Sequence, residues 1–236
     1  GKGIVYDTGG LSLKVGGGMV GMKSDMGGAA AMLAAFEAAA QLGSPQRLHL
    51  VLCLAENAIS PKALRNDDII ALLSGKTVEI NNTDAEGRLI LGDGVAHASK
   101  AGAFPTKVDL VVDMATLTGA QLVCTGKRHA AVMSNEAWAE SRGVAAGLKS
   151  GDLCFPVLYC PEFHRAEFAS KVADMKNSVK DRMNAQTSCA GSFIGEHLAE
   201  DFQGGWLHID MAGPSTANER GTGYGVALLM ALANVA

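Results

Sequence analysis

Short apolar runs recur along the chain, and they constrain its fold more than any other feature. "LHLVLCL" (48–54) and "VDLVVDMA" (108–115) are rich in Leu and Val and carry little charge. Runs of this length and composition are typical of strands buried on both faces, as in a parallel sheet covered by helices. Helix-like segments lie between them. The alternation predicts an α/β fold with a mostly parallel sheet.

Helix and strand boundaries follow from local signals. The Ala-rich segment before Gly43 predicts a helix over 26–42, and a first-turn proline with a terminal glycine predicts another over 61–75. "GIVYDTGG" is typical of a strand that ends in a loop, and residues 11–25 are irregular. The other expected strands are 48–54, 77–80, 108–115 and 205–212, and the other expected helices are 87–100, 136–149, 188–201 and 223–236.

Composition narrows the class of protein. The 236 residues carry a net charge of −4, and no Lys/Arg block suggests a surface for nucleic acid or anionic membrane. No apolar run approaches the ~20 residues that span a bilayer. The five cysteines are odd in number and contain no CxxC pair, which favours reduced thiols in a cytoplasmic protein. With no repeat or linker in the sequence, we expect one domain over residues 1–236.

Acidic residues gather where the expected strands end. Asp7 follows the first strand, Asp84 and Glu86 follow "TVEI", Asp113 closes the "DLVV" run, and Asp25 starts the Ala-rich helix. Ligands usually bind beyond the carboxyl ends of such strands. Carboxylates crowded in a cleft repel each other unless one takes a proton or a cation lies among them. The pattern therefore favours a site for two divalent metal ions.

Each acid also has a local explanation. Asp7 before Thr-Gly-Gly fits an Asx turn, and Asp25 fits a helix N-cap. Thr83 and Glu86 have the spacing of a capping box. Only the convergence of several acids on one end of the sheet favours the metal site over these alternatives.

Four blocks carry a family resemblance. "GKGIVYDTGGLSLK", "MKSDMGGAA", "NTDAEGRLIL" and "DMATLTGA" resemble, in order and spacing, the catalytic domain of the leucyl (cytosol) aminopeptidases, which are two-metal exopeptidases. The likeness continues through "VADMKNS" and "LHIDMAGP". It implies a zinc-exopeptidase-like α/β fold, with a central, mostly parallel mixed sheet sandwiched between helices. It also implies that residues 1–236 are the catalytic domain and that the family's N-terminal domain is absent from this chain.

The resemblance assigns metal ligands. It places Lys2, Asp7, Asp25 and Glu86 around a tighter metal, and Asp7, Asp84 and Glu86 around a more exchangeable one. Asp7 and Glu86 would bridge the two ions. Zn and Mn are the expected metals, with Mg or Co possible in the looser site, because carboxylate oxygens accept all of them. A lysine ligates only as the neutral amine, so metal binding should weaken as the pH falls.

The resemblance also assigns catalytic groups. Lys14 would donate to the oxygen of the scissile carbonyl, and Arg88 would hold a bicarbonate ion that takes a proton from the attacking water. Without the resemblance, Lys14 would be a solvated loop lysine and Arg88 an exposed helix residue paired with an acid. The implied reaction is hydrolysis of the N-terminal peptide bond by a metal-bridged water. The implied assembly is a homo-hexamer acting on peptides.

The resemblance to the family also predicts which residues contact the substrate. The main chain of Leu117 would lie beside the substrate amine. Met22, Thr116, Gly119 and Ala212 would surround the first side chain of the substrate. These are mostly small or apolar residues, which fits a Leu-like or Met-like N-terminal residue.

Two other functions stay open from the residues alone. A two-metal phosphohydrolase could use the same carboxylates, although such a site would be expected to include His and Asn ligands that these motifs lack. A catalytically silent family member could serve as an oligomeric interaction subunit. The intact set of expected ligands and catalytic side chains favours a metallo-aminopeptidase over both.

Overall fold

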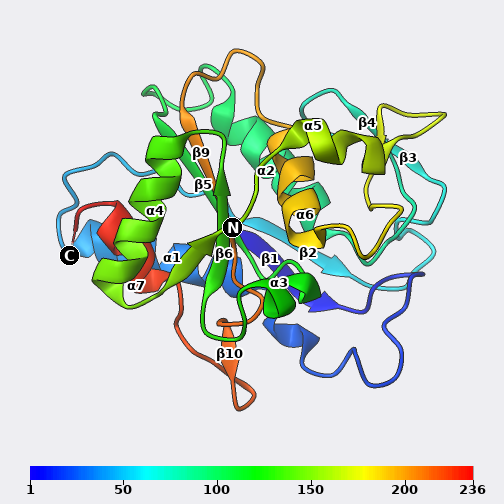
Figure 1. Cartoon of the computed structure of the whole chain (residues 1–236), viewed down its shortest axis with the longest axis horizontal. Helices are drawn as coiled ribbons and strands as arrows, with labels where there is room; N and C mark the ends of the chain where they lie inside the picture. Colours follow the sequence, from blue (N-terminus) through cyan, green and yellow to red (C-terminus); the bar gives the residue numbers. More distant parts are fainter. Residues whose placement is uncertain (236) are drawn as a thin grey trace.

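The protein is built around a mixed sheet, which lies at the centre of the computed structural model (Figure 1). The structure describes residues 1–235. Its strand order is β5–β9–β6–β7, with β5 parallel to β9, β9 antiparallel to β6, and β6 parallel to β7. A separate parallel pair, β1 with β2, lies beside β5. The bounds are β1 Lys2–Asp7, β2 Cys53–Asn57, β5 Leu110–Ala115, β6 Ala130–Ser134, β7 Cys154–Pro156 and β9 Gly205–Asp210.

Helices cover both faces of this sheet. On one side α1 (Gly27–Gln41) and α4 (Ala137–Ser150) pack against α7 (Val226–Leu232), and on the other side α2 (Gly87–Ser99) packs against α6 (Gln186–Gly195) (Figure 1). The predicted fold class, an α/β protein with a mixed sheet between helices, is confirmed.

Smaller elements surround these layers. One three-stranded sheet has the order β3–β4–β8, and β10 and β11 form a hairpin. The bounds are β3 Ile69–Ala71, β4 Thr77–Glu79, β8 Met175–Lys176, β10 Thr216–Ala217, β11 Arg220–Gly221, α3 Gly119–Cys124, α5 Pro161–His164, and the 3₁₀ helices Met22–Ser24 and Arg165–Phe168.

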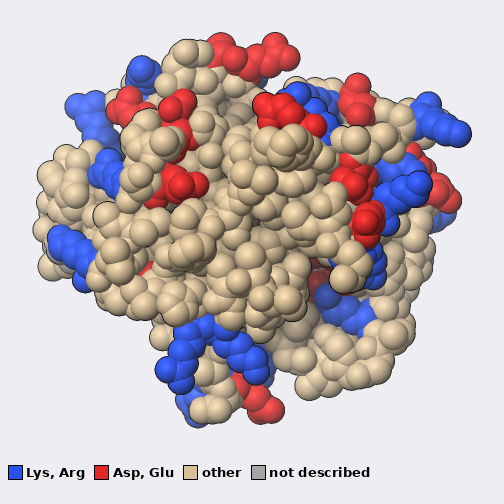
Figure 2. All heavy atoms as spheres, in the orientation of Figure 1, with Lys and Arg blue, Asp and Glu red and all other residues tan. Residues whose placement is uncertain are grey.

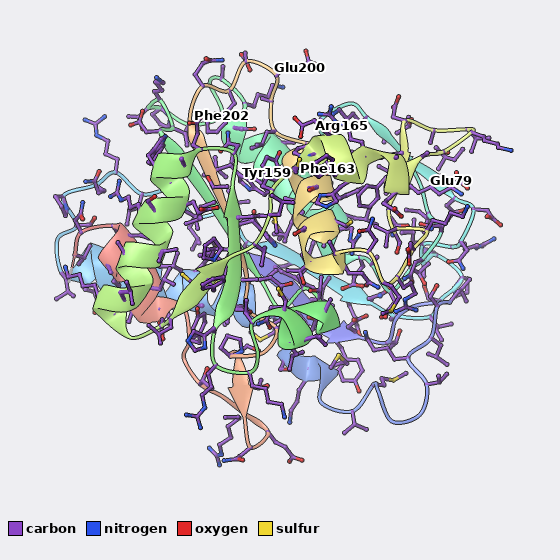
Figure 3. The ribbon with its side chains drawn as sticks, in the orientation of Figure 1. Glu79, Tyr159, Phe163, Arg165, Glu200 and Phe202 are labelled. Carbon is purple, nitrogen blue, oxygen red and sulfur yellow. The ribbon has the colours of Figure 1, made fainter. Side chains whose placement is uncertain are left out.

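The core is divided by the sheet. Met114 and Ile209 belong to the cluster that α1 and α7 cover, whereas Trp206 belongs to the cluster beneath α2 and α6. Tyr159, labelled in Figure 3, packs edge-on against Trp206 with ring centres 5.3 Å apart. A β-carbon on Gly28 would overlap the backbone carbonyl of Met114. Only glycine therefore allows α1 to approach β5 this closely.

The helix predicted over 61–75 is wrong. Ile69–Ala71 forms β3, which pairs antiparallel with β4 so that Ile70 faces Val78. Gly75 has a φ of 85°, and its N–H donates to the carbonyl of Leu72 across the turn between the two strands. Gly75 therefore serves a hairpin turn and does not end a helix. Packing of Ile70 onto the core beside Val78 stabilises the strand instead.

Several boundaries also move. The expected strand 48–54 is paired only from Cys53, where its ladder with Lys2 begins, and it continues to Asn57. The expected helix 188–201 ends at Gly195, and the closing helix ends at Leu232; Ala236 lies outside the described residues. Helices 26–42, 87–100 and 136–149 and strands 77–80, 108–115 and 205–212 are confirmed within a few residues.

The surface mixes both signs of charge. On the face in Figure 2, basic and acidic side chains are interspersed around the periphery, and the centre is largely uncharged. Among residues 1–235, every helix is too short or too polar to pass through a membrane.

Candidate active site

Three carboxylates converge beside the end of β1. One oxygen each from Asp7, Asp84 and Glu86 lies within 4.8 Å of the others. Asp7 is the last residue of β1, and the loop between β4 and α2 supplies the other two. Asp7 and Glu86 are buried, whereas Asp84 is half-buried. Oxygen ligands with this spacing suit a divalent cation.

Lys2 joins this cluster to the fourth acid. Its Nζ lies 2.9 Å from Asp25 Oδ2 and 3.0 Å from Glu86 Oε1, and it donates to the carbonyl of Thr116 at 3.1 Å. Burial opposes the charged form of Lys2, but Glu86 and Asp25 outweigh it and raise its pKa. Burial also raises the pKa of Asp25, even though Lys2 acts in the opposite direction. All five predicted metal ligands therefore form one contiguous group.

Lys14 reaches the open side of the same group. Its Nζ lies 2.6 Å from Asp84 Oδ1 and 3.0 Å from Asp7 Oδ2, and its side chain keeps 19% of its surface exposed. Burial opposes the charge, but the hydrogen bonds to Asp84 and Asp7 outweigh it and raise the pKa of Lys14. The lysine is thus a charged donor at the mouth of the carboxylate cluster.

Arg88, in the first turn of α2, is buried without an acidic partner. Within residues 1–235 its guanidinium forms no ion pair, and Nε and Nη1 have no hydrogen-bond partner. Burial lowers its pKa to about 10. The alternative of an exposed arginine paired with an acid is wrong. A buried guanidinium with free N–H groups fits a small planar oxyanion such as bicarbonate.

Three of the predicted substrate residues donate hydrogen bonds to buried carboxylates. Thr116 Oγ1 donates to Asp25 Oδ1 at 2.7 Å, and the N–H groups of Leu117 and Ala212 donate to Asp210 Oδ1 at 3.1 and 3.2 Å. Asp210 is fully buried, which raises its pKa. It thereby ties the loop after β5 to the loop after β9.

The two remaining predicted contacts lie on neighbouring elements. Met22 begins the 3₁₀ helix that leads to Asp25, and Gly119 begins α3, whose N-cap is Thr118. Ser215 lies beside the start of α1, where a β-carbon on Gly27 would be 3.6 Å from Ser215 Cβ and 3.1 Å from Thr116 Cγ2.

Asp113 does not join the site. Its carboxylate accepts from Trp206 Nε1 at 2.7 Å and lies 2.6 Å from His208 Nδ1, buried within the sheet. Because Asp113 lies inside β5 rather than beyond its end, it supports the core. His208 is a fully buried residue of β9.

The capping box expected from Thr83 and Glu86 is also absent. The Glu86 side chain makes no capping hydrogen bond at the start of α2. Thr83 Oγ1 instead donates to the carbonyl of Gly9 at 2.6 Å and accepts from Ser12 N. Glu86 faces Lys2 rather than the helix end, so the local explanation for this acid fails.

Sequence reasoning missed the polar groups that hold the ligand loops. Asn177 is fully buried, accepts from the N–H groups of Asn81 and Asn82, and donates to the carbonyls of Asn82 and Ala85. Asn57 contacts two of the carboxylates directly. Its place at the end of "CLAEN", a strand beside the one that ends in Asp7, is the only signal that could have drawn attention to it.

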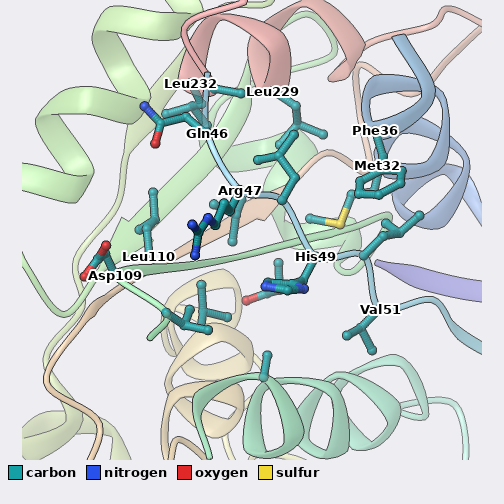
Figure 4. A pocket seen from close by; sticks show the side chains of 18 of the residues that line it. Met32, Phe36, Gln46, Arg47, His49, Val51, Asp109, Leu110, Leu229 and Leu232 are labelled. Carbon is teal, nitrogen blue, oxygen red and sulfur yellow. The ribbon is translucent and has the colours of Figure 1, made fainter. Parts of the chain in front are cut away.

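A cavity of about 640 Å³ lies elsewhere in the molecule (Figure 4). It is lined by residues 45–51 together with side chains of α1, α7 and β5, including Met32, His49 and Leu110. None of the predicted ligands or catalytic residues lines it. The cavity and the carboxylate cluster are separate features.

Comparison with known proteins agrees with this geometry. Residues 1–230 match the catalytic domain of the cytosol aminopeptidase family. The chain belongs to this family. It is 61% identical over 232 residues to "Probable aminopeptidase NPEPL1" of Mus musculus, covering 98% of this chain and 44% of the relative. It is 51% identical over 233 residues to "Leucine aminopeptidase 1" of Caenorhabditis elegans, covering 98% of this chain and 47% of the relative.

A solved family structure has the same fold. The leucyl aminopeptidase from Trypanosoma brucei in complex with bestatin superposes with a TM-score of 0.96 at 54% identity, over 99% of this chain and 45% of that one. The chain therefore spans about half the length of the relatives that it matches.

Proposed function

We propose that the protein is a metal-dependent aminopeptidase that removes apolar, Leu-like or Met-like residues from the N-termini of peptides. The observation that carries this proposal is the contiguous group of Lys2, Asp7, Asp25, Asp84 and Glu86. Family membership supports it, as do the names of the relatives.

The residues present fit the cofactors of the proposal. Lys2, Asp7, Asp25 and Glu86 would hold one divalent ion, and Asp7, Asp84 and Glu86 a second, with Zn or Mn as the first candidates and Mg or Co in the looser site. Such ions, when bound, lower the pKa of water and polarise a carbonyl. The free N–H groups of Arg88 would hold bicarbonate.

The remaining roles, which are to stabilise the scissile carbonyl and to orient the substrate, would fall to side chains and main-chain groups of the protein. Lys14, a charged donor at the mouth of the cluster, would donate to the oxygen of the scissile carbonyl as negative charge develops there. The main chain of Leu117, fixed by Asp210, would orient the amine of the substrate. Met22, Thr116, Gly119 and Ala212 would surround the first side chain. A substrate without a free N-terminal amine would lack this anchor, which explains trimming from one end only.

The proposal extends to the cellular setting. We place the protein in the cytoplasm, since several relatives are named cytosol aminopeptidases. We further propose that residues 1–236 act as one catalytic domain within a homo-hexamer.

Hydrolysis of leucine amide and methionine amide by the intact protein tests the function. Release of ammonia should require added manganese or zinc and should stop with a chelator. An N-acetylated leucine amide, which has no free amine, should stay intact. A protein that binds the metals and hydrolyses neither amide would instead support a silent interaction subunit. Metal-dependent cleavage of a phosphate ester in place of the amides would support a phosphohydrolase.

A further inference from the structure

The side chain of Asn57 lies between the two carboxylates that are proposed to bridge the metal ions. Its Nδ2 is 2.8 Å from Asp7 Oδ1, 3.4 Å from Glu86 Oε2 and 3.0 Å from the carbonyl of Thr83. One amide nitrogen thus contacts a strand end, a helix start and the loop between β4 and α2. No other neutral side chain among residues 1–235 makes a hydrogen bond to both carboxylates.

Chemistry fixes the orientation of this amide. All three neighbours of Nδ2 are acceptors, so the NH₂ end and not the oxygen must face them. The backbone of Asn57 is held as well, since it pairs with Asp7 in the ladder and its carbonyl accepts from both N and Oγ1 of Thr8 at 2.9 and 2.7 Å. Asn57 is therefore a fixed donor on a rigid strand.

The two oxygens of each carboxylate have different partners. Asn57 donates to Asp7 Oδ1 and Glu86 Oε2. Lys14 contacts the other oxygen of Asp7, Oδ2, and Lys2 contacts the other oxygen of Glu86, Oε1. A neutral donor can hold both carboxylates without cancelling the negative charge that attracts a cation. A lysine at this place would compete with the metal, and an aspartate would add a fifth carboxylate to the group and remove the donor.

We propose that Asn57 is a positioning residue that sets the orientation and spacing of Asp7 and Glu86 for metal binding. The inference rests on the proposed function, because it takes these carboxylates to be metal ligands. Removing a residue that orients a metal-binding side chain typically weakens metal affinity about 10- to 100-fold. The same loss is expected for Asn57.

Calorimetric titration of manganese into the intact, chelator-stripped protein tests this role. Asn57→Leu keeps the size of the side chain and removes the donor, and Asn57→Ser is a smaller, polar alternative if the leucine variant does not fold. Asn81→Leu is the matched control, because Asn81 hydrogen-bonds to Ser178 in a neighbouring loop and its side chain contacts no carboxylate.

The expected result is a manganese affinity about 10- to 100-fold weaker in the Asn57 variants, with Asn81→Leu close to wild type. Amide hydrolysis by the Asn57 variants should return when manganese is raised by the same factor, which a merely destabilised protein would not show. Wild-type affinity in both Asn57 variants, or an equal loss in Asn81→Leu, would overturn the inference alone. A wild-type protein that binds no manganese or zinc would overturn the proposed function as well.

Discussion

Replacing Arg88 with methionine should make the protein more stable and less active. Arg88 is buried, and its Nε and Nη1 have no partner within the described residues. Methionine has a similar length and carries no charge to desolvate. Replacing a buried charge by an apolar side chain of similar volume is often neutral or stabilising.

The magnitude follows from the pKa of Arg88. Burial lowers this pKa from 12.5 to about 10. Since a tenfold change in an equilibrium is worth about 1.4 kcal/mol, holding the charge in the fold costs on the order of 3 kcal/mol. Arg88→Met should therefore raise the free energy of unfolding by roughly 1–3 kcal/mol. If Arg88 holds the bicarbonate that accepts a proton, kcat should fall by about 100-fold or more.

Denaturant unfolding and leucine amide hydrolysis, measured on the same samples, test both halves of this prediction. Bicarbonate at ten times its dissociation constant should stabilise the wild type by about 1.4 kcal/mol and leave Arg88→Met unchanged. Arg142→Met is the control, because the Arg142 guanidinium donates to the carbonyl of Leu232 at 2.7 Å, so its loss should destabilise. An Arg88→Met variant that is fully active and less stable than wild type would refute the reasoning.

Three further predictions concern the fold, pH and metal binding. Gly28→Ala should cost about 3 kcal/mol of stability, because its β-carbon overlaps the carbonyl of Met114; thermal unfolding measures this, and a melting temperature equal to that of wild type would contradict it. Burial lowers the pKa of His197 to about 4, below its unfolded value of 6.5, so its contribution is complete above pH 6.5 and is lost as the pH falls towards 4. Unfolding curves should show about 2 kcal/mol of this loss by pH 5, and His197→Asn should remove it; an unchanged pH dependence in that variant would rule out His197 as the source. Asp84→Asn should reduce bound manganese from two ions to one in calorimetry, and retention of both ions would exclude Asp84 as a ligand of the looser site.

Local sequence signals determined much of the fold. The apolar run 108–115 and the Ala-rich run 26–42 became β5 and α1, because burial on both faces and helix propensity act over neighbouring residues. The helix predicted over 61–75 is wrong because local signals alone do not report which strands pair. Its proline and glycine were compatible with a helix, and only the pairing of β3 with β4 selected the hairpin.

For the candidate site, too, the sequence indicated some residues and the tertiary structure decided the roles of others. The placement of acids at strand ends made Asp7, Asp84 and Glu86 candidates from the residues alone, and the resemblance to the leucyl aminopeptidases added Lys2 and Lys14. Tertiary structure decided that Asp113 is bound to Trp206 within the sheet, that Arg88 is buried without an ion pair, and that Asn57 holds Asp7 and Glu86. These contacts join residues far apart in the chain, so burial and hydrogen-bond partners, which give a polar residue its role, exist only once the chain has folded.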